Sequence, residues 1–178
     1  MPRRYVSTSV KRREDPPLLM GRGRYLGDLR MAGLLSVAFL RSPHAHARIV
    51  AIDVREALAA PGVAAVLTGA ELAGLATPVR AELADPSYKA SGWPALAQGK
   101  VRFVGEPVVA VAAVDRYRAE DALDAIRVTY DPLPAVADAE ASMLADAPRI
   151  HDELADNIVL HVHYDNGQVE RAFEEAEV

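Results

Sequence analysis

The stretch PVVAVAAV, residues 107–114, is the most apolar run in the chain. It lacks the alternation of apolar and polar residues that marks a strand with one face in water, and such runs are typical of strands covered on both faces. We therefore predict a buried central strand here. An unpaired charge at Val109 or Val111 should be strongly destabilising, because nothing would offset the cost of removing it from water.

Local sequence patterns also predict the two elements that follow this run, a helix and a strand. Asp115 is placed to cap a helix over residues 116–126, whose apolar positions repeat at helical spacing (Ala119, Ala122, Leu123 and Ile126). The segment RVTYD after it is rich in strand formers and ends at Pro132 and Pro134. A strand bounded by prolines usually lies at the edge of a sheet.

The rest of the chain shows the same mixture of short strands and short helices. Helical turns are predicted in VREALAA before Pro61-Gly62, in GAELAGL, within the acidic, alanine-rich residues 138–156, and after Gly167. Further strands are predicted over residues 34–42, 47–53, 63–68 and 157–165.

The overall composition excludes several classes of function. The 178 residues carry 20 Lys and Arg against 25 Asp and Glu, a net charge of −5, so binding to nucleic acid is not expected. The chain has no cysteine, which removes disulfides, thiolate metal sites and cysteine nucleophiles together. Arg3-Arg4 is not followed by an apolar signal-peptide core, and no apolar run approaches the ~18 residues that span a bilayer. We expect a cytoplasmic protein without a membrane partner.

The stretch GRGRYLGD, residues 21–28, combines three glycines with two arginines. A phosphate cradle of the dinucleotide-binding type needs a strand before the glycines and a helix after them. The residues before it lack strand character, and those after it are strand-like. The pattern therefore favours a tight turn that orients Tyr25 and Leu26, with Asp28 bonding the turn.

Two histidine pairs are the main candidates for a metal site. His44 and His46 are two residues apart, as are His161 and His163, and this spacing places each pair on one face of a strand. With a nearby aspartate the two pairs would suit a divalent metal. Histidines on a polar face or at an interface are the alternative. The serines lie in no nucleophile motif and the carboxylates are scattered, so no catalytic residue is predicted.

Residues 76–99 form a long irregular stretch with several prolines and glycines. A loop of this length in a compact domain is usually functional or bound to a partner. Trp93 within it is either an exposed anchor for a partner or a cap on the chain's own core. In the RFVGEP turn, Glu106 at the entrance to the apolar run is either a functional carboxylate or a structural one that bonds backbone N–H groups.

Several blocks of the chain, in order, resemble the large, molybdenum-binding subunit of the molybdenum hydroxylases, the family of xanthine dehydrogenase, aldehyde oxidase and aerobic carbon monoxide dehydrogenase. The blocks are KRREDPPLLMGRGRYLGDL (11–29), LRSPHAHARIVAID (40–53), APGVAAVLTGAEL (60–72), KVRFVGEPVVAVAAVDRYRAEDALDAIRVTYDPLPAV (100–136) and GQVERAFEEAEV (167–178). They are similar to the N-terminal α/β hammerhead domain. The resemblance implies an α/β (α+β) fold, with a mixed β-sheet and helices packed mainly on one side.

The resemblance also implies how the chain divides and what it works with. We expect an extended arm over residues 1–20, the hammerhead over 21–138, and an extension over 139–178 leading toward molybdenum-binding domains. In the family, molybdopterin, 2Fe–2S clusters and FAD belong to other domains or subunits, so no catalytic, cofactor-binding or metal-binding residue is expected here. The expected partners are the molybdenum-binding remainder of the large subunit, the iron–sulfur subunit and the FAD subunit.

Two functions remain open from the sequence. The first is a scaffold domain, without activity alone, of an enzyme that oxidises aldehydes, N-heterocycles or CO. It would exist as an excised domain, a truncated product or half of a split subunit. The second is a stand-alone binding or regulatory protein of the same fold, with metal bound by the histidine pairs. For the first, the candidate interface residues are Tyr25, Trp93, Arg102, Phe103, Gly105 and Glu106.

Overall fold

The computed structural model describes residues 9–164 and 167–176, and the chain divides into two units between Leu34 and Leu35. The first unit contains helix α1 (Asp15–Leu19) and the 3-10 turn η1 (Leu26–Asp28). The arm that was expected to be extended thus contains one helical turn. Pro16 and Pro17 fit there because the first turn of a helix has no use for their missing N–H groups.

The apolar run forms the central strand of a three-stranded sheet in the second unit. The strand order is β1–β5–β3, with bounds Ser36–Arg41, Pro107–Ala113 and Val63–Thr68. Val108, Val109, Val111 and Ala113 of β5 are fully buried. The prediction of a buried central strand is confirmed.

A second three-stranded sheet has the order β4–β2–β6, with bounds Lys100–Val101, Ala47–Asp53 and Arg127–Pro132. The proline-ended strand β6 lies at an edge, as predicted. Every ladder in both sheets is antiparallel, so the expectation of one mixed sheet is corrected. The reason is that β5 runs between β1 and β3 in the opposite direction to both, which keeps these two parallel strands apart.

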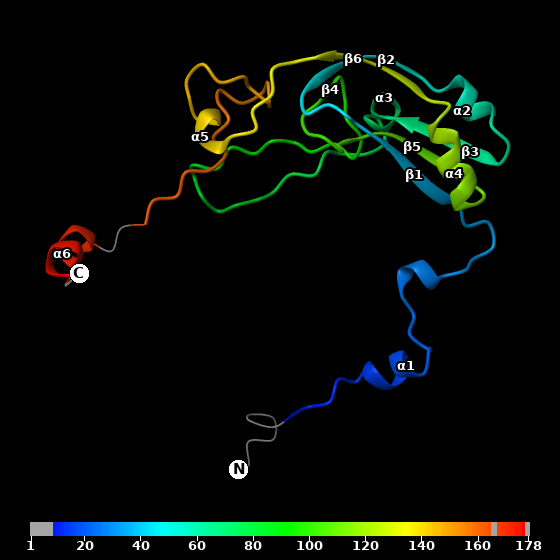
Figure 1. Ribbon diagram of the computed structural model, residues 1–178, viewed down its shortest axis with the longest axis horizontal. Coiled ribbons are helices and arrows are strands. Elements are labelled where there is room, and N and C mark those ends of the chain that lie inside the picture. The colour runs from blue at the N-terminus through cyan, green and yellow to red at the C-terminus, as the bar shows by residue number, and fades with distance from the viewer. Residues whose placement is uncertain (1–8, 165–166, 177–178) are drawn as a thin grey trace. The chain divides into compact units, whose positions relative to one another are not determined.

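Short helices α2 (Arg55–Ala59), α3 (Gly69–Leu72) and α4 (Arg116–Leu123) connect and cover the strands (Figure 1). Two further helices, α5 (Ala139–Ser142) and α6 (Val169–Glu175), follow the last strand in the sequence. Asp115 caps α4 as predicted, since its Oδ1 accepts the Arg118 N–H at 2.9 Å. Ala122 of α4 joins Val109, Val111 and residues of the second sheet in a single apolar core.

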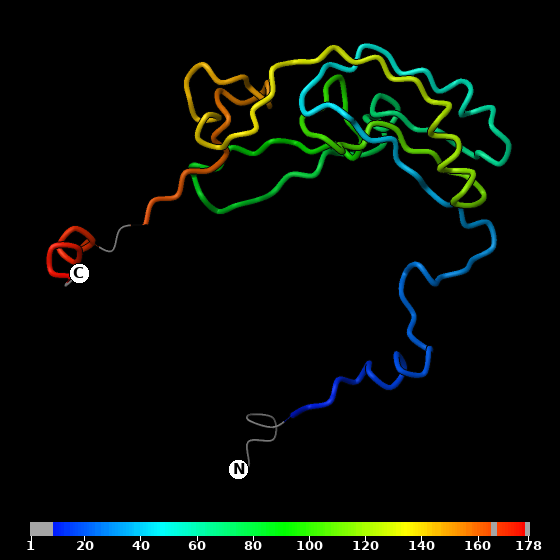
Figure 2. Tube along the Cα trace, viewed as in Figure 1, coloured from blue at the N-terminus to red at the C-terminus, as the bar shows by residue number. Residues whose placement is uncertain are grey.

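The long loop (residues 76–99) and the C-terminal segment (residues 139–164) run side by side (Figure 2). The Lys89 N–H donates to the Val159 carbonyl at 2.8 Å, and the Lys89 ammonium lies 2.8 Å from Asp156 Oδ1. The strand predicted over residues 157–165 is wrong: residues 158–164 belong to no strand, and Asp165 lies outside the described residues. This segment meets a loop through isolated hydrogen bonds instead of a strand through a ladder. Among the described helices, none has the length and apolar character to cross a bilayer.

Candidate functional site

The glycine-rich stretch folds as a turn. Asp28 Oδ2 accepts the Tyr25 N–H at 3.0 Å, which closes η1 as the sequence predicted. Only this three-residue 3-10 turn follows the first two glycines, so the helix required by a dinucleotide fingerprint is not formed. The Tyr25 side chain is two-thirds exposed.

The RFVGEP turn is held by its own backbone and by the buried carboxylate of Glu106. Glu106 Oε2 accepts the Arg102 N–H, and the Glu106 carbonyl accepts the Ser42 N–H at 2.9 Å. Gly105 has a φ of 88°, a left-handed conformation that favours glycine, and donates its N–H to the Ser42 carbonyl at 2.8 Å. These bonds support the structural reading of Glu106.

This turn and the long loop together form a hollow of about 450 Å³, here called the Trp93 hollow. Its lining residues are Gly92, Trp93, Pro94, Ala95, Arg102, Phe103, Glu106, Pro107, Ile150 and His151. Trp93 is 67% exposed and Phe103 56% exposed, so Trp93 does not cap the core. Four of the six candidate interface residues therefore meet at one place. Gly105 lies in the same turn, and Tyr25 belongs to the first unit.

The polar groups of the Trp93 hollow are few and mostly engaged. Arg102 Nη1 donates to the Lys100 carbonyl at 3.3 Å and lies 3.9 Å from Glu106 Oε1. Arg102 Nε is buried and has no hydrogen-bond partner. The Arg102 side chain as a whole is 18% exposed, so part of it is open to an acceptor on an incoming group. The hollow is suited to receiving an apolar group that carries an acceptor.

Sequence reasoning missed two of the lining residues, Ile150 and His151. They belong to residues 139–178, for which the sequence predicted only an extension beyond the hammerhead. No local pattern marks them, because they reach the hollow through the distant contacts that hold this segment, such as the 2.9 Å ion pair between Lys100 and Asp152.

His44 and His46 take structural positions. The buried His46 uses Nδ1 to bond the Pro134 carbonyl at 2.7 Å, and the His44 ring packs 4.8 Å from the Tyr130 ring. Burial raises the pKa of the Tyr130 hydroxyl. His161 and His163 are exposed. Within residues 9–164 and 167–176, no three His, Asp or Glu side chains gather closely enough to hold a metal ion.

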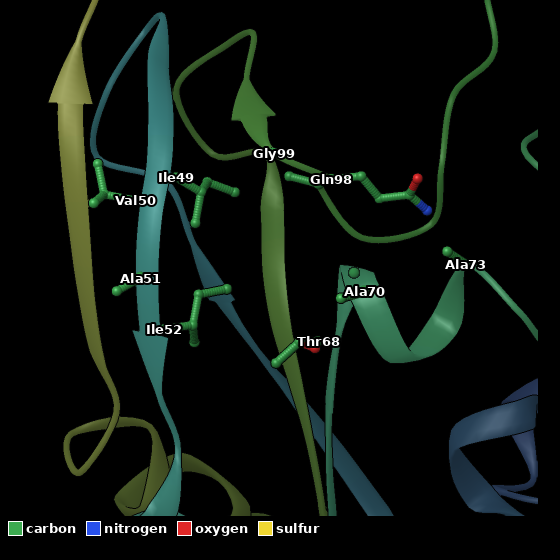
Figure 3. A pocket seen from close by; sticks show the side chains of 11 residues that line it. Ile49, Val50, Ala51, Ile52, Thr68, Ala70, Ala73, Gln98 and Gly99 are labelled. Atoms are coloured by element: carbon green, nitrogen blue, oxygen red, sulfur yellow. The ribbon is translucent and has the colours of Figure 1, made fainter.

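A second hollow, of about 370 Å³, opens between β2 and α3 (Figure 3). Ile49 and Ile52 extend from β2 toward the side where Thr68 and Gln98 lie. Its eleven lining residues include no ionisable side chain, and the Thr68 hydroxyl is already bonded to Glu71 Oε2 at 3.0 Å. This hollow offers apolar contact and no acid or base.

Comparison with known proteins gives these two hollows a context. Residues 20–134 match the family described as "Aldehyde oxidase and xanthine dehydrogenase, a/b hammerhead domain". The chain belongs to this family. The hammerhead fold expected from the sequence is confirmed, with its strands arranged in two small antiparallel sheets.

Relatives of this hammerhead domain are large subunits of oxidising enzymes. The chain is 38% identical over 175 residues to the nicotine 6-hydroxylase large subunit of Paenarthrobacter nicotinovorans, covering 98% of the chain and 21% of that relative. Quinoline 2-oxidoreductase from Pseudomonas putida 86 superposes with a TM-score of 0.82 at 50% identity, covering 86% of the chain and 19% of that structure. The chain spans about a fifth of the length of these relatives.

Another solved relative is a copper- and molybdenum-containing CO dehydrogenase, with a TM-score of 0.76 at 35% identity over 95% of the chain and 22% of that structure. The homologous enzymes are thus molybdenum-containing. The described residues provide no cluster of His, Asp or Glu side chains that could ligate a metal ion directly.

Proposed function

We propose that this chain is the docking scaffold of a molybdenum hydroxylase large subunit and has no activity of its own. The observation that carries the proposal is the Trp93 hollow, where the exposed side chains of Trp93 and Phe103 lie beside the half-buried Arg102. Aromatic residues and arginine are the residue types that most often dominate binding energy at protein interfaces. The occupant of the hollow is an apolar side chain of the remaining large subunit, with a carbonyl or carboxylate near Arg102.

The proposal includes a division of the chain and a setting for it. Residues 1–20 form an N-terminal arm, residues 21–138 the hammerhead, and residues 139–178 the extension leading toward the molybdenum-binding part. The complete enzyme carries molybdopterin, 2Fe–2S clusters and FAD, works in the cytoplasm with an iron–sulfur and an FAD subunit, and oxidises aldehydes, N-heterocycles or CO. The family match and the large-subunit relatives support this setting.

The test is capture of the remaining large subunit by the tagged chain. We expect the double variant Trp93→Ala, Phe103→Ala to weaken capture by at least roughly 30-fold, since even one aromatic anchor contributes about 2 kcal/mol or more. Both side chains are mostly exposed, and Trp93 holds its place through backbone bonds with Val79 at 2.8 and 2.9 Å. The variant should therefore keep its fold.

Tyr117→Ala is the matched control, because Tyr117 is 78% exposed on α4, away from the Trp93 hollow. Capture that is unchanged in the double variant would refute the role of the hollow. Oxidation of an aldehyde or an N-heterocycle by the purified chain with an added electron acceptor would refute the scaffold role.

A further inference from the structure

The sheet β1–β5–β3 has one face in the core. Its other face lacks a cover beyond Val108, which is itself buried in the core next to the bulge at Leu40 and Arg41. Val109 and Val111 of β5 point to the core face. Residues paired across strands lie on the same face of a sheet. The other face, here called the outer face, is therefore formed by three paired rows, which are Val37 and Phe39 of β1, Ala110 and Ala112 of β5, and Ala65 and Leu67 of β3.

The six residues of the outer face are all apolar and accessible, and Val37 and Phe39 also line a surface hollow with the charged Arg41, Arg116 and Glu120. Phe39 is 43% exposed and Val37 is 55% exposed, and the other four residues are half-buried. An antiparallel sheet that faces water normally carries polar residues on that side. The non-alternating run in β5 is instead typical of a strand with cover on both faces, and the described part of this chain supplies cover on only one.

We propose that an amphipathic helix from the remainder of the large subunit covers the outer face. The central row consists of two alanines, whose small side chains let a helix approach the sheet closely, and helix on sheet is a standard layer arrangement. Arg41 lies at the rim, with its guanidinium 5.8 Å from the centre of the Phe39 ring. An acidic residue at the edge of the covering helix would complement it.

The size of the face identifies the source of the cover. Six side chains are far fewer than the roughly 20–30 residues per partner of a stable interface between separate proteins. A second copy of the chain is therefore a poor occupant. A segment of the same polypeptide has a high effective concentration and needs less contact area. The relatives are about five times as long as the matched segment, which leaves ample chain to supply it.

This inference rests on the proposed membership in a longer subunit and uses a different surface from the Trp93 hollow. The test compares Phe39→Glu with the control Tyr117→Glu, in the chain alone and in the large subunit that contains it. In the chain alone, both side chains face water, so each variant should shift the Tm by less than about 3 °C. In the large subunit, Phe39→Glu should lower the Tm by roughly 10 °C or prevent assembly, because it buries an unpaired charge, whereas Tyr117→Glu should not.

Three results would overturn the inference. The first is a large subunit that tolerates Phe39→Glu, and the second is equal destabilisation of the chain and the subunit. The third is a dimer of the isolated chain, seen by light scattering, that Phe39→Glu dissociates, because a second copy would then be the cover. The role of the Trp93 hollow is tested separately, by capture with the Trp93→Ala, Phe103→Ala variant. The two proposals can therefore fail independently.

Discussion

Gly69 lies where helix α3 comes closest to the loop before β4. A Cβ added at this position would lie 2.1 Å from the Ala97 carbonyl oxygen, and a backbone atom cannot move aside cheaply. We expect Gly69→Ala to lower the free energy of unfolding by about 1–3 kcal/mol, the usual cost of overpacking. The midpoint of urea unfolding, compared at unchanged m-value, measures this loss.

Gly74→Ala is the matched control for Gly69→Ala, because a Cβ at Gly74 would have no atom within 4 Å. The sequence did not distinguish these two glycines, since both lie in the same predicted helical turn. Only the approach of the Ala97 backbone, which is distant in sequence, separates them. Equal midpoints for the two variants would show that the backbone of the loop before β4 can move aside at little cost in stability.

Strand β5 presents its two faces to different surroundings, and a pair of neighbouring substitutions can show this. Val111 is fully buried, whereas Ala112 lies half-buried on the outer face. In the isolated chain, Val111→Asp should cost about 3 kcal/mol or more, because it buries an unpaired charge. Ala112→Asp should cost about 1 kcal/mol, the range of strand propensity. Thermal unfolding of both variants checks the difference, and similar losses would mean that both faces are already covered.

Strand β5 also shows which secondary-structure elements can be predicted from the sequence. The run 107–114 predicted a central strand because its pattern is local, and Asp115 predicted the start of α4 for the same reason. The alternation in residues 157–164 was just as clear but produced no strand, because a strand also needs a partner and the neighbouring segment is a loop. A local sequence pattern does not specify which strand pairs with which. This also explains why the antiparallel pairing was missed.

At the scale of the whole chain, the candidate site was half predictable. Trp93, Phe103 and Glu106 stand out locally as a lone indole, an aromatic residue in a glycine-containing turn and a carboxylate between glycine and proline. Their meeting in one hollow with Ile150 depends on the contacts between the long loop and residues 139–164. Those contacts are mostly single hydrogen bonds and ion pairs, which leave no periodic signal in the sequence.

These contacts make the packing of the C-terminal segment sensitive to acid. The hydrogen bond from the Lys89 ammonium lowers the pKa of Asp156, and that from Lys100 lowers the pKa of Asp152. A carboxyl with a lowered folded-state pKa stabilises the fold fully above the ordinary aspartate pKa of about 3.9, and this contribution is lost as the pH falls through the lower folded-state value. We expect the segment to loosen from the long loop below about pH 4.

Hydrogen exchange at single amides can separate this loosening from unfolding. The Lys89 N–H, bonded to Val159, should lose protection on acidification while the Ala97 N–H, bonded to Pro107 at 2.8 Å in the core, keeps it. Asp156→Asn should lower Lys89 protection at neutral pH and flatten its dependence on acid, because one of the titrating groups is then gone. A parallel loss at both amides would indicate global unfolding. A Lys89 amide that is insensitive to pH would show that Asp156 does not hold the segment.

Ile150 lies in this segment and lines the Trp93 hollow. Release of the segment would therefore open one wall of the hollow, so acid should weaken capture of the remaining large subunit over the same pH range.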